Sequence, residues 1–221
     1  MARNQLAATQ EATATANSAQ RRQTQEERTA ISSDRMVQVA MELIASRGAG
    51  KTSLRDICEA AGYSRGLASS RFGTKDAFLT FLVAQFHETW EAELERSVGQ
   101  KRGVAAILTA IDTFERFILE HSGPMRSRYI IMFECLGVDN EVRRRLFENH
   151  KVYIADVAKW IKEGIEDGTI DKSIDPGDFS IHFNSVIFGT IYHWLIASEE
   201  IDITRSCRFW ARQVKSFIEK G

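Results

Sequence analysis

The chain has 221 residues, of which 43% are hydrophobic and two are proline, so it is long enough to bury a substantial core. Its 29 basic and 30 acidic residues give a net charge of -1, which excludes an overall basic coat for nucleic acid but not a local basic patch. Cys58, Cys135 and Cys207 are far apart in the sequence and form no C-x-x-C pair, so neither a disulfide framework nor a structural zinc site is expected.

Residues 1–27 are predicted to form a disordered tail, because they are rich in Ala, Thr, Gln and Asn and have no apolar period. This segment lacks the apolar core of a secretory signal. No run elsewhere approaches the roughly 20 apolar residues that cross a membrane. We therefore expect a cytoplasmic protein with no membrane partner.

Two helices are predicted after the tail. The first carries apolar residues at steps of three and four, and it stops at Gly48. The second has about two turns and can be capped by Thr52 or Ser53, with Asp56 three residues after Ser53 as a capping box. Gly62 ends this second helix.

The next stretch is a weak helix former that lies between stronger ones. Ser64 can cap a short helix there, and Thr74 can cap a long one that follows. Residues 62–75 contain Arg65, Arg71 and Lys75 but no carboxylate. Two short helices joined through a glycine turn indicate a helix-turn-helix, whose second helix must present donors to DNA without bulk or negative charge. A glycine-rich loop with merely solvated charges is the alternative.

The same stretch resembles the N-terminal domain of the tetracycline-repressor (TetR) family of bacterial transcriptional regulators. The resemblance covers about residues 30 to 82. The family pattern is met by Gly48, Thr52, Ser53, Ile57, Ala61, Gly62, Ser64, Gly66, Phe72, Lys75 and Asp76. One departure is that Ser69 and Ser70, followed by Arg71, replace the tyrosine pair usual in the family, so arginine must carry more of any DNA contact.

The resemblance implies which residues contact DNA. Arg65 would make a bidentate contact to guanine, and Lys75 would bind phosphate. Tyr63 and Leu67 would either contact DNA or pack inward. The full predicted set is Thr52, Ser53, Arg55, Tyr63, Ser64, Arg65, Gly66, Leu67, Ser69, Ser70, Arg71 and Lys75.

The rest of the chain also has helical periodicity, so the predicted fold is all-α. Helices are expected at about 104–118, 125–136, 140–167, 176–198 and 203–220, with a break at Gly123 and Pro124. The predicted division is a tail over 1–27, a helix-turn-helix DNA-binding domain over 28–80 and a helical effector-binding and dimerisation domain over 81–221.

The penultimate helix is apolar nearly all round, so it needs partners on two faces. One face would close the core of its own domain, and the other would meet a second subunit, as the family pairs its last two helices. A helix that is simply central in a monomer is the alternative. The predicted dimer interface is Phe179, Val186, Thr190, Trp194, Trp210, Val214, Phe217 and Ile218.

Catalytic motifs are missing from the sequence. The five histidines form no H-E-x-x-H pair, and no P-loop, dinucleotide glycine pattern or nucleophile elbow occurs, so we expect no enzyme, no metal and no cofactor. A binding cavity for a largely apolar effector is expected instead. Its predicted lining is Phe117, Met125, Tyr129, Phe133, Trp160, Phe183 and Tyr192, with Asn184 and His193 as polar anchors.

These patterns together predict a homodimeric transcriptional repressor that binds a palindromic double-stranded DNA operator and is released by a small, hydrophobic effector. One alternative is a small-molecule sensing or sequestering protein in which the helix-turn-helix is only an interaction surface. A transcriptional activator is the other alternative.

Overall fold

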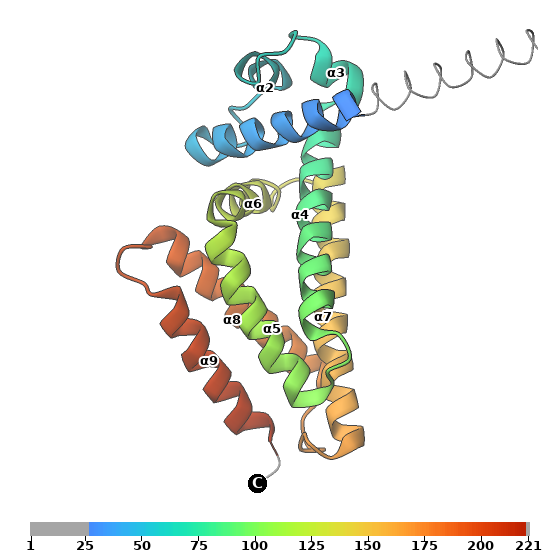
Figure 1. Cartoon of the computed structure of the whole chain (residues 1–221), viewed down its shortest axis with the longest axis vertical. Helices are drawn as coiled ribbons and strands as arrows, with labels where there is room; N and C mark the ends of the chain where they lie inside the picture. The colour runs from blue at the N-terminus through green and yellow to red at the C-terminus, as the bar shows by residue number, and fades with distance from the viewer. Residues whose placement is uncertain (1–26, 220–221) are drawn as a thin grey trace, which may run out of the picture.

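The computed structural model describes residues 27–219, and every regular element in that range is a helix (Figure 1). Within the same range, the only bridge of β type joins Ile170 and Glu219. The all-α fold class is therefore confirmed. The predicted tail lies outside the described residues except for residue 27, where the first helix is already formed. None of the described helices combines the length and the apolar character needed to cross a bilayer.

The N-terminal unit consists of a helix over residues 27–47, α2 (Leu54–Ala60), α3 (Leu67–Phe72) and the first turns of α4 (Lys75–Val98). Both α2 and α3 are short, so they are stabilised mainly by the core that they share with their neighbours. The buried side chains of this smaller core include Met36, Ala40, Ile44, Leu54, Ile57, Phe78 and Leu82.

Local capping explains where these helices begin. Ser53 and Asp56 form the expected capping box, and Thr74 accepts a hydrogen bond from a backbone N–H in the first turn of α4. The predicted cap at Ser64 is wrong. The Ser64 carbonyl, not its hydroxyl, accepts from the Leu67 N–H at 3.0 Å, and α3 begins only at Leu67.

The larger part of the chain contains α5 (Gly103–Glu120), α6 (Ser122–Glu134), α7 (Glu141–Asp167), α8 (Pro176–Ile196) and α9 (Ile203–Ile218). The side chains of Asn140 and Asp175 cap α7 and α8, and Gly168 adopts a left-handed conformation after α7. The expected break at Gly123 and Pro124 is wrong. The chain turns at His121, and α6 includes both residues in its first turn, where proline is tolerated.

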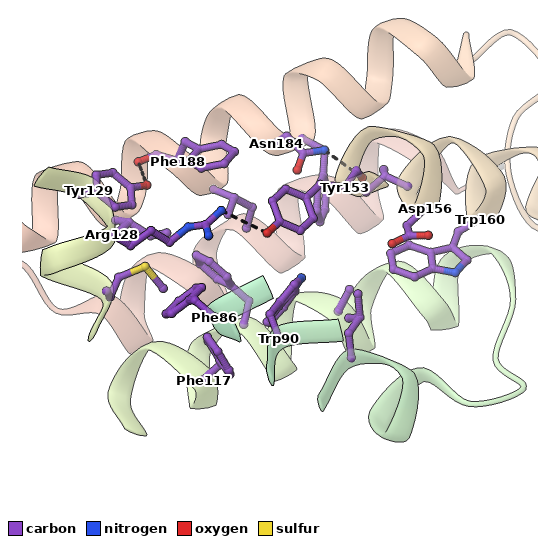
Figure 2. Close-up of a pocket in the computed structure, with 18 residues that line it drawn as sticks. Phe86, Trp90, Phe117, Arg128, Tyr129, Tyr153, Asp156, Trp160, Asn184 and Phe188 are labelled. Carbon is purple, nitrogen blue, oxygen red and sulfur yellow. Dashed lines mark hydrogen bonds between the residues drawn. The ribbon is translucent and has the colours of Figure 1, made fainter. Parts of the chain in front are cut away.

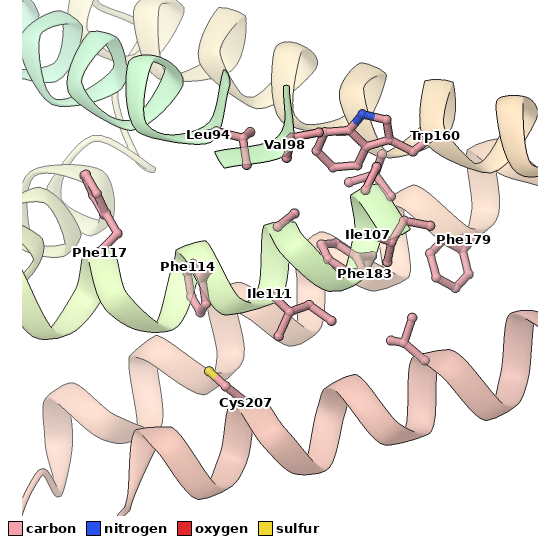
Figure 3. Close-up of a cluster of buried hydrophobic side chains, with 14 of the residues drawn as sticks. Leu94, Val98, Ile107, Ile111, Phe114, Phe117, Trp160, Phe179, Phe183 and Cys207 are labelled. Carbon is pink, nitrogen blue, oxygen red and sulfur yellow. The ribbon is translucent and has the colours of Figure 1, made fainter. Parts of the chain in front are cut away.

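The helices α4 and α7 run side by side, and α5 packs against both of them as well as against α9 (Figure 1). Near its start α5 comes very close to α7, since a Cβ on Gly164 would lie 2.9 Å from the Gly103 Cα. Figure 3 shows the larger core between these helices. It includes Ile107, Ile111, Phe114 and Phe117 of α5, Ile161 of α7, Phe183 of α8 and Cys207 of α9.

The helix α6 contributes to both cores. Met125 and Tyr129 belong to the larger core, whereas Ile131 belongs to the smaller one. The helix α4 is shared in the same way, because Leu82 lies in the smaller core and Leu94 in the larger one. The predicted domain boundary at residue 80 thus falls inside a continuous helix, and the division stays a prediction.

Candidate functional site

The turn between α2 and α3 and the exposed side of α3 form one small surface on the N-terminal unit (Figure 1). Gly62 adopts a φ of 79° in this turn, a conformation that favours glycine, and the chain reverses within a few residues. Five predicted DNA-contacting residues are exposed on this surface: Ser64, Arg65, Gly66, Ser69 and Ser70.

A carboxylate on α2 pairs with two cations at this surface. The Nε of Arg65 lies 2.5 Å from Oε1 of Glu59, and the Nε of Arg55 lies 3.2 Å from the same oxygen. The hydrogen bond from Arg55 and the charge of Arg65 lower the pKa of the Glu59 carboxyl. Glu59 is therefore ionised at neutral pH and competes with any phosphate for these guanidinium groups. Nothing in the sequence pattern marks Glu59 as part of this surface.

Two predicted DNA contacts point into the protein. Thr52 is only 2% exposed, and its hydroxyl donates to the carbonyl of Gly48 at 2.8 Å. Arg71 donates from Nη1 to the carbonyl of Thr29 at 3.1 Å and to the hydroxyl of Ser33 at 2.7 Å. Both side chains therefore stabilise the unit itself, Arg71 by joining α3 to the first helix. Thr52 is not exposed on the surface that α3 presents, whereas Arg71 is only half-buried, so a DNA contact by Arg71 stays a prediction.

The other residues of the predicted set lie at the margins of this surface. Lys75 donates from Nζ to the Gly50 carbonyl at 3.1 Å, so its charge lies beside the turn before α2. Tyr63 and Leu67 are half-buried against the smaller core, as the alternative that they pack inward predicts. Ser53 is exposed at the positive end of α2. For all of these residues a DNA contact stays a prediction.

A second candidate site is a cavity of about 80 Å³ lined by side chains of α4, α5, α6, α7 and α8 (Figure 2). Aromatic and aliphatic side chains from these helices form most of its wall. Six of the nine predicted effector-pocket residues line it: Phe117, Met125, Tyr129, Trp160, Phe183 and Asn184.

The other three predicted pocket residues lie elsewhere. Phe133 and Tyr192 are exposed, and their ring centres lie 5.9 Å apart in a separate, open hollow beside α8. His193 is exposed and lines neither the cavity nor this hollow. Tyr192 and His193 are exposed on α8, and an effector contact by any of these three residues stays a prediction.

A polar chain that the sequence pattern did not indicate begins in the wall of the cavity, at Arg128 and Tyr153. The Nη2 of Arg128 donates to the Tyr153 hydroxyl at 3.1 Å, and that hydroxyl lies 3.1 Å from Nδ1 of His87. Because arginine can only donate, the Tyr153 oxygen accepts from Arg128 and its proton is directed to His87. The Nε2 of His87 lies 3.2 Å from Oε1 of Glu91, which completes the chain.

The protonation state of His87 follows from its surroundings. Burial lowers its pKa to about 4, and the charge of Arg128 contributes in the same direction. The imidazole is thus neutral at pH 7. Burial likewise raises the pKa of the Tyr153 hydroxyl, which stays protonated. Arg128 is therefore the charged member of this chain within the cavity.

Asp156 lines the cavity as well, near its Trp160 end and away from Tyr129 (Figure 2). Burial raises the pKa of this carboxyl, and the negative charge of Glu91 adds to the shift. The cavity thus has a cation toward α6 and an acid toward the far end of α7. Both could have been suspected from the sequence, since Arg128 lies one helical turn after Met125, and Asp156 lies one turn before Trp160.

The helix α6 connects the cavity to the N-terminal unit. Ser127, the neighbour of Arg128, donates from its hydroxyl to the Met41 carbonyl at 2.6 Å. At the end of α6, the Glu134 carboxylate accepts from the N–H groups of Ala49 at 3.1 Å and Gly50 at 2.7 Å. These bonds join α6 to the first helix and to the turn before α2.

The outer face of α8 and α9 carries exposed apolar side chains, which are Ile181, Tyr192, Ile196, Phe209 and Phe217. Of the predicted dimer interface, only Phe217 is fully on this face, being 67% exposed. Val186, Thr190, Trp194 and Trp210 are half-buried. Phe179, Val214 and Ile218 are buried in the core of the single chain, and an interface contact by them stays a prediction.

Comparisons with known proteins identify relatives of both parts of the chain. Residues 37–80 match the family model described as bacterial regulatory proteins, tetR family. The chain is 23% identical over 186 residues to the HTH-type transcriptional regulator TtgR of Pseudomonas putida, and the match covers 79% of this chain and 85% of that protein.

Solved structures share the whole architecture. NalD, the secondary repressor of the MexAB-OprM multidrug efflux pump in Pseudomonas aeruginosa, matches with a TM-score of 0.74 at 18% identity, over 88% of this chain and 98% of that chain. The transcriptional regulator FadR from Bacillus subtilis in complex with stearoyl-CoA matches with a TM-score of 0.73 at 18% identity, over 82% and 97%. The fold is thus an N-terminal helix-turn-helix unit followed by a larger helical domain.

Proposed function

Because this chain belongs to the TetR family of bacterial transcriptional regulators, we propose that it is a repressor that binds a palindromic operator as a homodimer and is released by a small apolar effector. The relatives that it matches are regulators of transcription rather than enzymes. The solved neighbour NalD is a repressor, and FadR was solved with stearoyl-CoA. We propose that this chain likewise represses transcription and binds a ligand.

The observation that carries the proposal is the placement of α6 between the cavity and the DNA-binding unit. On adjacent positions of this helix, Arg128 lines the cavity and Ser127 is bonded to the Met41 carbonyl. A ligand that moves Arg128 therefore moves a residue that holds the first helix. Glu134 would transmit the same movement to the turn before α2. Effector binding and operator binding are coupled if they favour different positions of α6.

The DNA-bound state is proposed to use α3 in the major groove. The exposed Arg65 would read guanine, and Ser69 and Ser70 would donate to phosphate or to a base edge. Ser53 and Arg55 would meet phosphate at the start of α2, with Lys75 beside them. Each copy presents one short helix, and two copies related by a two-fold axis would read a palindrome one helical turn apart.

Dimerisation is proposed to use the exposed face of α8 and α9. This face carries five large apolar side chains that are accessible to water in the single chain, among them Ile181, Phe209 and Phe217. Large apolar side chains exposed on two neighbouring helices are typical of an interface. A four-helix contact between α8 and α9 of two copies would cover it and fix the spacing of the two α3 helices.

The proposal is tested with the purified protein and a random-sequence DNA library, from which bound sequences are selected and their dissociation constants measured. We expect an enriched palindrome. Arg65→Ala should relax the base preference, while Lys75→Ala should weaken all sequences alike and reduce the salt dependence. Arg102→Ala is the matched control, because Arg102 is also exposed and near glutamates but lies just before α5, in the larger domain.

Two outcomes would assign the chain a different function. If no sequence is enriched although small molecules bind the cavity, the chain is a sensing or sequestering protein and the repressor assignment fails. If an operator is found but expression of a reporter rises when the protein is present, the chain is an activator.

A further inference from the structure

We propose that the effector is an organic monoanion, a carboxylate on an apolar body, and that Arg128 binds its carboxylate. The inference rests on the proposed function in so far as the bound molecule is the effector. It concerns the chemistry of the cavity, however, and it can be tested without DNA.

Arg128 is a buried cation without an anionic partner. It is 6% exposed, and among the residues that the structure describes no carboxylate lies within ion-pair distance of its guanidinium group. Its Nη1 is buried and has no hydrogen-bond partner. Arginine cannot lose its proton to escape this environment, so burial in this state is costly unless an anion compensates it.

The guanidinium group is held in place by neutral groups. Its central carbon lies 4.8 Å from the centre of the Phe86 ring, and Nη2 donates to the Tyr153 hydroxyl at 3.1 Å. These contacts fix the plane of the group and leave Nη1 without a hydrogen-bond partner. His87, the next member of the polar chain, is neutral in this setting and contributes no charge.

Figure 2 shows the guanidinium group of Arg128 directed from α6 into the cavity, between Phe86 and Tyr153. A carboxylate is the anion that pairs with a planar guanidinium group by two parallel hydrogen bonds. In Arg128, Nη2 already donates one hydrogen bond to Tyr153, whereas Nη1 has no partner. We expect the carboxylate to accept one hydrogen bond from each of these nitrogens. The site is therefore built for one small, planar anionic group.

The rest of the cavity restricts the ligand to a single negative charge. The wall consists mainly of aromatic and aliphatic side chains, including Trp90, Phe117 and Phe183. Asp156 lies toward the other end, and among the described residues the cavity lining offers no cation other than Arg128 for a second anionic group (Figure 2). A phosphate with two charges would also exceed the compensation that one arginine offers. A ligand with an apolar or aromatic body and one terminal carboxylate fits both ends of the cavity.

A hydrophobic cation is the competing ligand, since aromatic rings and Asp156 could attract it. It would have to lie in the same cavity as the uncompensated charge of Arg128. Burial also raises the pKa of Asp156, so that its carboxyl is drawn toward the neutral form. The balance of charge in the cavity therefore favours an anion.

The experiment compares probes that share a shape and differ in charge. Binding of benzoate, 3-phenylpropanoate and octanoate to the whole protein is measured by calorimetry, each beside its neutral amide and its primary ammonium analogue. At least one carboxylate should bind about tenfold or more tightly than its amide and its ammonium analogue, as a charge-assisted bond in a dry site implies. If no carboxylate in the panel is preferred over its amide, the proposal is overturned.

Arg128→Met supplies the second test, because methionine has a similar length and no charge. This variant should lose the preference for the carboxylate and bind the amide at least as well as before. It should also unfold at the same temperature as the original protein or higher, since a buried uncompensated charge is removed. An unchanged carboxylate preference in Arg128→Met would contradict the proposal. Arg116→Met is the control, because Arg116 is an exposed arginine of α5 outside the cavity.

Operator binding, measured separately by fluorescence anisotropy, distinguishes this inference from the proposed function. If a carboxylate binds through Arg128 but does not weaken the DNA complex, the cavity binds an organic monoanion as proposed. The proposal that this ligand releases the protein from DNA would then be wrong. If only neutral or cationic compounds release the DNA, the effector is not the anion that we propose, although the repressor function stands.

Discussion

The Glu134 carboxylate accepts a hydrogen bond of 2.7 Å from the Gly50 N–H, and through it the end of α6 is tied to the turn that begins the DNA-binding motif. The same carboxylate accepts from Ala49 at 3.1 Å. A charged acceptor with two backbone donors is a strong and directional contact. It joins two segments that are far apart in the sequence.

Replacing this carboxylate should therefore weaken the coupling between cavity and operator. In Glu134→Ala, both N–H groups lose their charged acceptor, and the free energy of unfolding should fall by about 1–2 kcal/mol. The change in operator affinity on adding the tightest-binding carboxylate probe should shrink by several-fold. The measurement is operator anisotropy with and without the probe, and Glu120→Ala is the control at an exposed glutamate of α5. Full retention of the probe effect in Glu134→Ala would show that α6 signals by another route.

Much of this fold could be predicted from the sequence because helix ends are set locally. Ser53 and Thr74 each cap a helix as predicted, since a cap needs only a side-chain oxygen near the next two or three N–H groups. The prediction at Ser64 failed where the backbone carbonyl, rather than the hydroxyl, made the contact.

The candidate sites were less predictable because they depend on contacts between distant segments. The sequence predicts a DNA contact for Arg71, but in the folded chain its Nη1 donates to the hydroxyl of Ser33 in the first helix at 2.7 Å. Phe86 of α4 and Arg128 of α6 meet only when both helices pack around the cavity. Periodicity alone could not decide which side of α8 faces outward: Phe179, predicted at an interface, is buried in the single chain, and Tyr192, predicted to line the cavity, is exposed.

The Glu59 carboxylate is expected to limit DNA affinity, because it pairs with both Arg55 and Arg65. Glu59→Gln keeps the size of the side chain and removes its charge, so both cations become available and repulsion of phosphate falls. Affinity for any duplex should rise by about three- to tenfold at low salt, which is the effect of freeing one or two phosphate contacts. Anisotropy over a salt series measures this change. Glu88→Gln, at an exposed position of α4, should leave affinity unchanged, and a weaker complex with Glu59→Gln would contradict the expectation.

His87 should make stability depend on pH. Its pKa is about 4 in the folded protein, below the usual value of 6.5, so the unfolded chain binds a proton more readily between these values. The stabilisation is thus complete above pH 6.5 and is lost as the pH falls toward 4. Between roughly pH 7 and pH 5 the contribution of His87 to the free energy of unfolding should fall by about 2 kcal/mol.

Urea unfolding at both pH values measures this contribution in the original protein and in His87→Gln. The variant lacks the titrating group, so its stability should change less between the two pH values. His182→Gln, at an exposed histidine, is the control and should keep the full pH dependence. An equal loss of stability in the original protein and in His87→Gln would show that other groups cause it.

Phe217 is expected to lie in the dimer interface, because it is 67% exposed on the outer face of α9 and belongs to the same apolar face as Ile181 and Phe209. Phe217→Asp places a charge where a second copy would bury an aromatic ring, and an unpaired buried charge is strongly unfavourable. The protein should shift from dimer to monomer at micromolar concentration, as measured by sedimentation. Phe147→Asp is the control, since Phe147 is similarly exposed but lies on α7, away from this face. A monomeric variant should also lose affinity for a full palindrome while its affinity for a single half-site is little changed, because only the linkage between two α3 helices is broken.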